Sequence, residues 1–356
     1  MTDSTDNRST PVEDEVGVEL ETSGSEFPYV AAVVRASGIH PKSSRMVSLG
    51  LRTFDADGTT GQTWHSTFTI GEDPGPVHLH GLTPEDLNGS PRYGTKLNEV
   101  SAILEGRTVI THDSPMTWGF IIEEAKRARR WANRANRNRR GHSGSRIRVG
   151  RVPAPETVVD TLATARRQRQ ILDDRRLFAV ASLYDVSAPS PIASIDNADL
   201  RESDRTLEAT NVLKDLFLAQ SAADEATVMS WTNEDLRADS LGLQRSSVRV
   251  DAIEAPHPEK NPGKYKPGKS LATGMVFCVA PELEFSPDEI IAAGVAAGLT
   301  YTESVTRDAS ILVCNRPVDV PVEALTGKAM HAERKGIPLV SDSAFLRLTE
   351  DLRNKA

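Results

Sequence analysis

After Gly274 the chain alternates short apolar runs with segments of helical periodicity, and this alternation restricts its fold more than any other feature. The predicted elements are a strand at 275–280, a helix at 287–297, strands at 299–302 and 310–314, a helix at 327–335, a strand at 337–340 and a helix at 343–352. Strands that are joined through helices need crossover connections. The pattern therefore predicts a small α/β domain with a mostly parallel sheet.

The preceding region begins with strands and continues with helices and strands in alternation. Apolar runs predict an antiparallel meander with strands at 29–34, 46–53 and 63–70. The periodicity then predicts a helix at 97–104, a strand at 108–111, a helix at 117–131, a strand at 157–161 and helices at 177–183 and 205–220. This order predicts a second α/β unit, a mixed sheet flanked by helices.

Length and composition set the domain organisation. The 356 residues, of which 38% are apolar and 26% charged, are enough for two or three domains. Residues 1–26 hold eight acidic residues against one basic residue, which predicts a disordered acidic tail. We expect a first domain at 27–222 with a basic insertion at 126–151, a linker at 223–267 and a second domain at 268–353.

No membrane span or signal peptide is expected, because no apolar run reaches roughly 18 residues and the N-terminus is acidic and polar. The predicted location is the cytoplasm, in association with the nucleoid. Cys278 and Cys314 both lie in apolar runs, which predicts buried, reduced thiols and argues against a disulfide framework or a zinc site.

Positive charge is concentrated in one stretch. Residues 126–151 contain eleven Lys or Arg and no acidic residue, although the formal net charge of the chain is -8. Such a strip on an otherwise acidic protein predicts a polyanionic partner, either DNA or RNA. The predicted contacts are Lys126, Arg127, Arg129, Arg130, Arg134, Arg137, Arg139, Arg140, Arg146 and Arg148, with Trp131 available for base stacking. The alternative is a solvated loop, or one that contacts the acidic tail.

Four motifs in the first region follow one another in a characteristic order. They are Ser37–Lys42 with Arg45–Leu51, His80–Leu87, Val109–Pro115 and Asp160–Arg166. In this order they resemble the DEDDh exonucleases, including the proofreading epsilon subunit of bacterial DNA polymerase III and its relatives, over residues 28–220. The resemblance implies a ribonuclease H-like fold, a role in DNA replication or repair, and single-stranded DNA or DNA 3' ends as a partner.

The same resemblance implies a centre of four carboxylates that hold two metal ions, with a His as general base. In this chain Val33 and Arg35 take two of the carboxylate positions and Thr117 takes a third. Asp204 is the best candidate for the last one, and no His lies within 143–256 to act as the base. We therefore expect no catalytic residue, no metal and no other cofactor, because Val offers no lone pair and Arg repels Mg²⁺.

Two residues near this centre have alternative interpretations. His112 is expected to bond nearby backbone at the end of its strand rather than to act in catalysis. Arg35 is expected either to pair with Asp113 or Asp204, or to replace the lost metal charge and bind a phosphate. The acidic stretch Glu19–Gly24 imitates the missing motif, but it lies in the predicted tail.

Several short motifs in the last region resemble a BRCT domain over residues 268–353. They are Gly274–Cys278, Ala297–Leu299, Ser310–Val313, Gly327–Ala329 and Gly336–Ser341, followed by Phe345 at a core aromatic position. The resemblance implies docking to a replication or repair protein, or contact with DNA ends. It also makes Lys328 a candidate phosphate ligand, although Val279 or Ala280 takes the position of the hydroxyl that phosphopeptide sites use. The alternative for Lys328 is an exposed first-turn lysine.

Three functions are consistent with these features. The first is a non-catalytic nucleic-acid-binding and scaffolding protein of DNA replication or repair. The second is an active, Mg²⁺-dependent 3'-5' exonuclease with displaced ligands. The third is a structural partner of another subunit that binds no nucleic acid.

Overall fold

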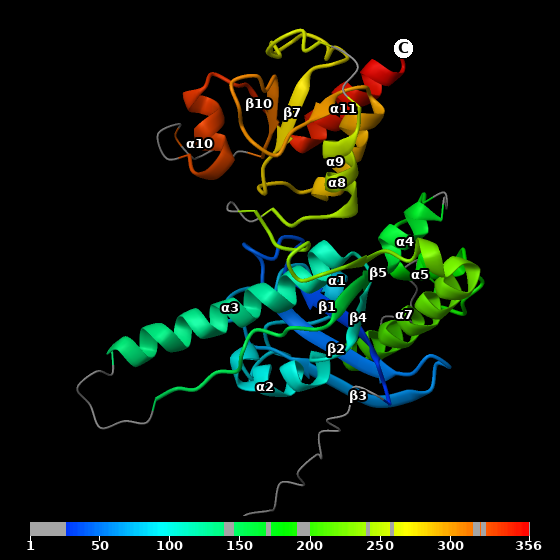
Figure 1. The fold of residues 1–356 in the computed structure, drawn as a ribbon. Helices are drawn as coiled ribbons and strands as arrows, with labels where there is room; N and C mark the ends of the chain where they lie inside the picture. The colour runs from blue at the N-terminus through cyan, green and yellow to red at the C-terminus, as the bar shows by residue number, and fades with distance from the viewer. Residues whose placement is uncertain are drawn as a thin grey trace, which may run out of the picture.

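The computed structural model shows two α/β units that are joined by a connecting segment (Figure 1). It describes residues 26–138, 146–168, 172–190, 200–239, 243–256, 260–315, 321 and 325–355. The predicted acidic tail, apart from Glu26, lies outside the described residues, as do Arg139 and Arg140 of the basic insertion. Within the described ranges, none of the helices combines the length and the apolar character that crossing a membrane requires.

The first sheet has the strand order β3-β2-β1-β4-β5-β6. Its strands are β1 (Tyr29–Ala36), β2 (Met46–Phe54), β3 (Thr60–Thr67), β4 (Thr108–Thr111), β5 (Thr157–Asp160) and β6 (Ser230–Trp231). The first three strands pair antiparallel, whereas β4 pairs parallel with β1 and with β5. The predicted mixed sheet is confirmed. Its last strand, β6, pairs antiparallel with β5 and lies inside the segment predicted as a linker.

Helices cover both faces of this sheet. They are α1 (Val77–His80), α2 (Tyr93–Leu104), α3 (Ser114–Asn138), α4 (Thr161–Arg167), α5 (Leu177–Ser182) and α7 (Glu202–Asp224), followed by the short helix η1 (Glu225–Thr227). On β1, Val30 and Val34 pack into the core formed with α2 and α3. Ala31 and Val33 pack on the other face, with α7. The alternation of side chains along β1 therefore turns Val33 and Arg35 toward α7.

Helix α3 contains the predicted helix at 117–131, continues into the basic stretch as far as Asn138 and extends well beyond the sheet (Figure 1). Its distal half is supported by the chain that returns along it after residue 145. The Asn136 side chain donates to Ile147 O and accepts from Ile147 N, both at 2.9 Å. This support buries Ala132 and leaves the opposite side of the helix exposed.

The second unit has a parallel sheet in the order β10-β9-β7-β8, as predicted. Its elements are β7 (Val276–Val279), α9 (Pro287–Ala296), β8 (Thr300–Tyr301), β9 (Ile311–Val313), α10 (Gly327–Arg334), β10 (Leu339–Val340) and α11 (Asp342–Arg353). Gly298, with φ of 77°, allows the tight turn from α9 into β8. Phe345 is fully buried and packs on Phe277 at a ring-centroid distance of 5.2 Å.

The connecting segment, which lies between β6 and β7, packs on both units. Leu236 joins the core of the first unit, whereas α8 (Ser247–Glu254) packs on α9 and β8. Cys278 and Cys314 are buried free thiols, as predicted. Burial raises the pKa of each thiol to about 12, so both stay protonated at neutral pH.

Candidate nucleic-acid interface

The carboxyl-terminal half of β1 carries the two side chains that replace the expected carboxylates. Val33 packs against apolar residues of the sheet and α7 and offers no ligand atom. The Nε of Arg35 donates to Thr206 Oγ1 on α7 at 3.1 Å. Burial lowers the pKa of Arg35, while the negative charge of Glu202 opposes this shift. Arg35 thus lies at the expected centre as a partly buried cation.

The predicted partner of Arg35 was wrong. The structure places Thr206 and Glu202 beside its guanidinium, and not Asp113 or Asp204. Asp204 is exposed on α7 and takes no part in this cluster. The acidic residue that α7 turns toward the sheet is Glu202, which is only 8% exposed and which the sequence analysis did not identify.

Glu202 is held by three donors. It accepts hydrogen bonds from Ser48 Oγ, from Thr206 Oγ1 at 2.6 Å and from His65 Nε2 at 2.9 Å. Although burial opposes ionisation, the bonds from His65, Ser48 and Thr206 lower the pKa of Glu202 below its usual value. The carboxylate is therefore ionised, and its oxygens are committed to protein donors.

A second arginine lies at this centre. Arg205 on α7 is electrostatically coupled to Arg35 and adds positive charge to it. A Cβ added to Gly81 would lie 3.0 Å from Arg205 NH1, so this guanidinium rests against the turn after α1. Arg205 has no ion-pair partner among the described residues. No sequence pattern singled out Arg205, although it immediately follows Asp204, the candidate for the last carboxylate.

The polar groups of Val109–Pro115 and of the start of α3 are bonded to other groups of the protein. Thr117 is buried, and its hydroxyl donates to His112 O at 3.2 Å. The His112 ring bonds Thr161 Oγ1 at 2.9 Å through Nδ1 and Arg175 O at 2.7 Å through Nε2. Burial lowers the pKa of His112, so the ring is neutral at pH 7.

Both carboxylate oxygens of Asp160, at the end of β5, also accept hydrogen bonds from the protein. Its Oδ2 accepts from the Ser114 amide at 2.9 Å and from the Ser114 hydroxyl at 2.7 Å, where α3 begins. Its Oδ1 accepts from the amides of Leu162 and Ala163 in α4. The carboxylate thereby caps two helices, which is a structural role.

The donors at this centre do not fit two bound Mg²⁺ ions. Within the part of the chain that the structure describes, no three His, Cys, Asp or Glu side chains form a group that could hold a metal. A two-metal site needs several free carboxylate oxygens. Here Glu202 is engaged by three donors, and Arg35 and Arg205 contribute positive charge instead.

The cations of the basic insertion fall into two groups. Some are bonded to other groups of the protein, and others have no ion-pair partner within the described residues. Arg127 donates to backbone carbonyls of the 41–44 turn and to Glu124, which makes it part of the fold. Lys126 pairs with Glu123 at 2.9 Å. Arg130 lies 3.8 Å from the same Glu123 carboxylate, with half of its side chain exposed.

Five exposed arginines of the insertion have no ion-pair partner within the described residues. They are Arg129, Arg134, Arg137, Arg146 and Arg148. On α3, Arg130, Arg134 and Arg137 follow at intervals of four and three residues, so they form one stripe along the helix. We call these three residues the α3 stripe. It lies opposite the side on which Ala132 is buried.

Trp131 lies beside the α3 stripe and is 48% exposed. The guanidinium carbon of Arg92 lies 5.3 Å from the centroid of its ring. Arg92 directly precedes α2, so this contact joins the start of α2 to the distal half of α3. Trp131 was a predicted stacking residue, whereas its contact with Arg92 carries no signal in the sequence.

Lys328, the candidate phosphate ligand, is buried at 2% exposure, which contradicts its interpretation as an exposed lysine. Its Nζ donates to Val279 O at 2.9 Å and lies 3.3 Å from Asp239 Oδ2 in the connecting segment. Arg249, also buried, lies 3.6 Å from the same oxygen and pairs with Glu303 at 2.8 Å. An internal carboxylate therefore already contacts Lys328.

The family model for the BRCA1 C Terminus (BRCT) domain matches residues 268–348. These residues form a BRCT domain. No match was found among curated protein sequences.

Similar solved structures are exonucleases. The nuclease domain of 3'hExo, a DEDDh family member bound to rAMP, has a TM-score of 0.38 at 7% identity and covers 58% of this chain and 98% of its own. The zinc-bound complex of E. coli ExoI with ssDNA has a TM-score of 0.38 at 10% identity, with coverages of 56% and 41%. Exonuclease I with the inhibitor BCBP has a TM-score of 0.39 at 10% identity, with coverages of 56% and 42%. The chain thus spans less than half of the length of these exonuclease I structures.

The BRCT domain contacts the first unit through the start of α9. Asp288 accepts a hydrogen bond from Ser246 Oγ and lies 3.6 Å from Arg166 of α4, while Glu289 lies 3.7 Å from Arg175. Burial raises the pKa of Asp288. These ion pairs place the BRCT domain next to α4 and the chain that follows it.

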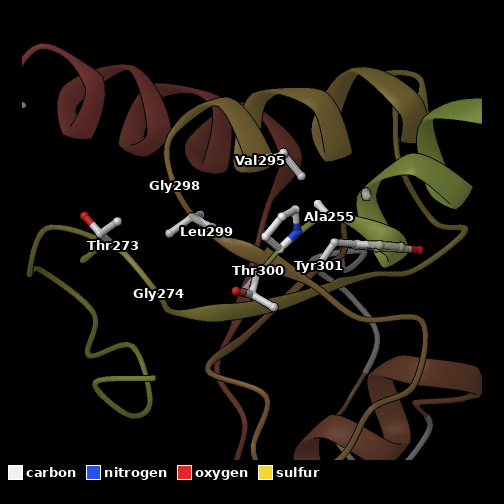
Figure 2. A pocket seen from close by; sticks show the side chains of 10 residues that line it. Ala255, Thr273, Gly274, Val295, Gly298, Leu299, Thr300 and Tyr301 are labelled. Carbon is white, nitrogen blue, oxygen red and sulfur yellow. The ribbon is translucent and has the colours of Figure 1, made fainter. Parts of the chain in front are cut away.

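A small cavity of about 230 Å³ lies in the BRCT domain between α8, α9 and β8 (Figure 2). Val295, Leu299 and Ala255 line it, together with Thr300 and Tyr301. None of its lining residues is charged, so it provides no cation for a phosphate.

Proposed function

We propose that this chain is a non-catalytic nucleic-acid-binding and scaffolding protein of DNA replication or repair, similar to the epsilon subunit of DNA polymerase III. The observation that carries the proposal is the set of exposed, unpaired arginines on α3 and the returning segment. In a chain with a net charge of -8, these residues are the part of the surface that attracts a polyanion.

The absence of catalysis follows from the chemistry at β1. Metal-dependent phosphodiester cleavage needs carboxylates that hold the metal ions and a base that activates water. Val33 supplies no ligand, Arg35 repels a cation, and the Thr117 hydroxyl is committed to His112 O. The His112 ring is bonded at both nitrogens and lacks a free one with which to accept a proton.

The arginines at the former centre have a different use. Arg35 and Arg205 lie close enough to influence each other, and a guanidinium binds phosphate oxygens through two parallel hydrogen bonds. We assign this pair a contact with one phosphate of the nucleic acid. The Thr206 hydroxyl accepts from Arg35 and donates to Glu202. Glu202 thereby helps to hold the Arg35 guanidinium in place.

The BRCT domain supplies the scaffolding. Lys328 is occupied by Asp239, so recruitment of a replication or repair protein uses another surface of the domain. The proposed location is the cytoplasm, with the protein held at the nucleoid through its DNA contacts.

The deciding experiment combines a nuclease assay with a binding measurement on the full chain. A labelled single-stranded oligonucleotide is incubated with Mg²⁺ or Mn²⁺, and binding is measured by fluorescence anisotropy at several salt concentrations. We expect salt-dependent binding without shortening of the 3' end. Shortening that requires the metal would establish the exonuclease alternative, and absence of binding at low salt would leave the structural-partner alternative.

The Arg35→Ala variant tests the proposed phosphate contact of Arg35 and Arg205 separately from the contacts of the arginines on α3. It should weaken binding and reduce the salt dependence by about one phosphate contact, or about 0.7 in slope. The Arg237→Ala variant is a matched control, because Arg237 is 75% exposed and lies in the connecting segment. If Arg35→Ala binds as tightly as the wild type, Arg35 does not contact the nucleic acid.

A further inference from the structure

The Trp131 indole is held in place from one side only. Arg92 covers one face of the ring at 5.3 Å, which is within the range of a cation–π contact, and 48% of the residue stays exposed. Trp118, in contrast, is 3% exposed and belongs to the core of the first unit. Trp131 therefore presents a half-exposed aromatic ring on the surface of α3.

Close packing of two helices creates this arrangement. A Cβ added to Gly94 of α2 would lie 3.0 Å from the Cβ of Ala128, so the glycine allows α2 and α3 to approach closely. Tyr93 is buried and anchors the start of α2. Arg92 consequently precedes a fixed helix, and its guanidinium reaches the indole three residues beyond Ala128.

The position of the indole relative to the α3 stripe matches the pattern of a single strand. Arg130 and Arg134 are separated by about 6 Å along the helix axis, from a rise of about 1.5 Å per residue. Trp131 projects beside them, one turn before Arg134. A single strand presents phosphates and unpaired bases side by side, and aromatic rings next to cations bind both.

We propose that Trp131, oriented by Arg92, stacks on an unpaired base, and that the α3 surface therefore prefers single-stranded nucleic acid to a duplex. This inference rests on the proposed nucleic-acid-binding function and adds the substrate class to it. Bases in a duplex are already stacked and paired, so a duplex can use the arginines but not the indole. The arginines attract any polyanion, whereas the indole adds affinity for the single strand alone.

The test compares oligothymidylate with a duplex of the same length on the full chain. Trp131→Ala should weaken binding of the single strand about tenfold, as expected for loss of one stacked base, and should leave duplex binding within about twofold. Trp131→Phe should keep most of the affinity, because a phenyl ring also stacks. Arg92→Ala should weaken single-strand binding less than Trp131→Ala. Circular dichroism checks that each variant keeps its helices.

A spectroscopic signal distinguishes stacking from a merely structural role. Addition of the single strand should quench the tryptophan fluorescence of the wild type, and this quenching should be absent in Trp131→Phe. If Trp131→Ala leaves both affinities unchanged, or weakens both equally, the stacking inference is wrong, while a loss of binding on replacing Arg130 and Arg134 would still support the proposed function. If the wild type binds neither nucleic acid, both proposals fail.

Discussion

Removal of two arginines of the α3 stripe should reduce the salt dependence of binding by a calculable amount. Five exposed arginines of the insertion lack an ion-pair partner within the described residues. If each contacts one phosphate of a single strand, the slope of log K against log salt is about -3.5 from these residues, since one contact contributes about -0.7. Between 50 and 200 mM salt, such a slope weakens binding about 130-fold. Replacing Arg134 and Arg137 by Ala should reduce the loss to about 20-fold.

The assay is a set of anisotropy titrations at four or more salt concentrations, with wild type, Arg134→Ala/Arg137→Ala and Arg237→Ala. Arg237 is an exposed arginine in another part of the surface, so its variant should keep the slope of the wild type. The difference of about 1.4 in slope between the wild type and the double variant is the decisive quantity. Equal slopes for these two proteins would show that Arg134 and Arg137 do not contact phosphates, because cations that bind phosphates must release counterions.

Two further predictions concern the connecting segment and the contact between the units. Asp239→Asn should destabilise the protein by about 3 kcal/mol, because it leaves the buried Lys328 ammonium without its carboxylate; urea unfolding measures this, and Lys328→Met should cost less. Burial, with the charges of Asp160 and Asp288, raises the pKa of Asp113 from 3.8 to about 7. The folded state therefore binds more protons than the unfolded state between these values, and this contribution to stability should fall as pH rises from about 4 to about 7. Asp113→Asn, which tolerates the φ of 64°, should be more stable than the wild type at pH 8 and lose the difference at pH 4. Thermal unfolding at the two pH values would show the opposite order if Asp113 were an ion-pair partner.

Local periodicity was sufficient for most elements of the fold. Short stretches rich in apolar residues identified β1, β2, β4 and β7 within two residues of their observed ends. The short strand β6 was missed because two residues carry no pattern, and its place is set by pairing with Val158 and Val159. Helix α3 contains the predicted helix at 117–131 and continues through the polar start of the basic insertion, where the Asn136 contact with Ile147 supports it in place of an apolar stripe.

Which residues lie at the expected carboxylate positions was predictable from the sequence, but their geometry was not. The motif order alone placed Val33, Arg35 and Thr117 where carboxylates were expected. The choice between Asp204 and Glu202 depends on the rotation of α7, because residues two apart on a helix point about 200° apart at 3.6 residues per turn. Packing of α7 on the sheet decides that rotation and buries Glu202.

The order of strands and helices, the presence of Val33, Arg35 and Thr117 in the motifs and the concentration of positive charge in residues 126–151 could all be read from the amino-acid sequence. These properties depend on residue identity and short-range spacing. Only the tertiary structure decided that Arg127 is fastened to the 41–44 turn while Arg134 is free, that Asp239 contacts Lys328, and that Arg92 covers Trp131. The physical reason is that each of these contacts joins segments that are distant along the chain, and a cation becomes available to a ligand only when no folded neighbour has already paired with it.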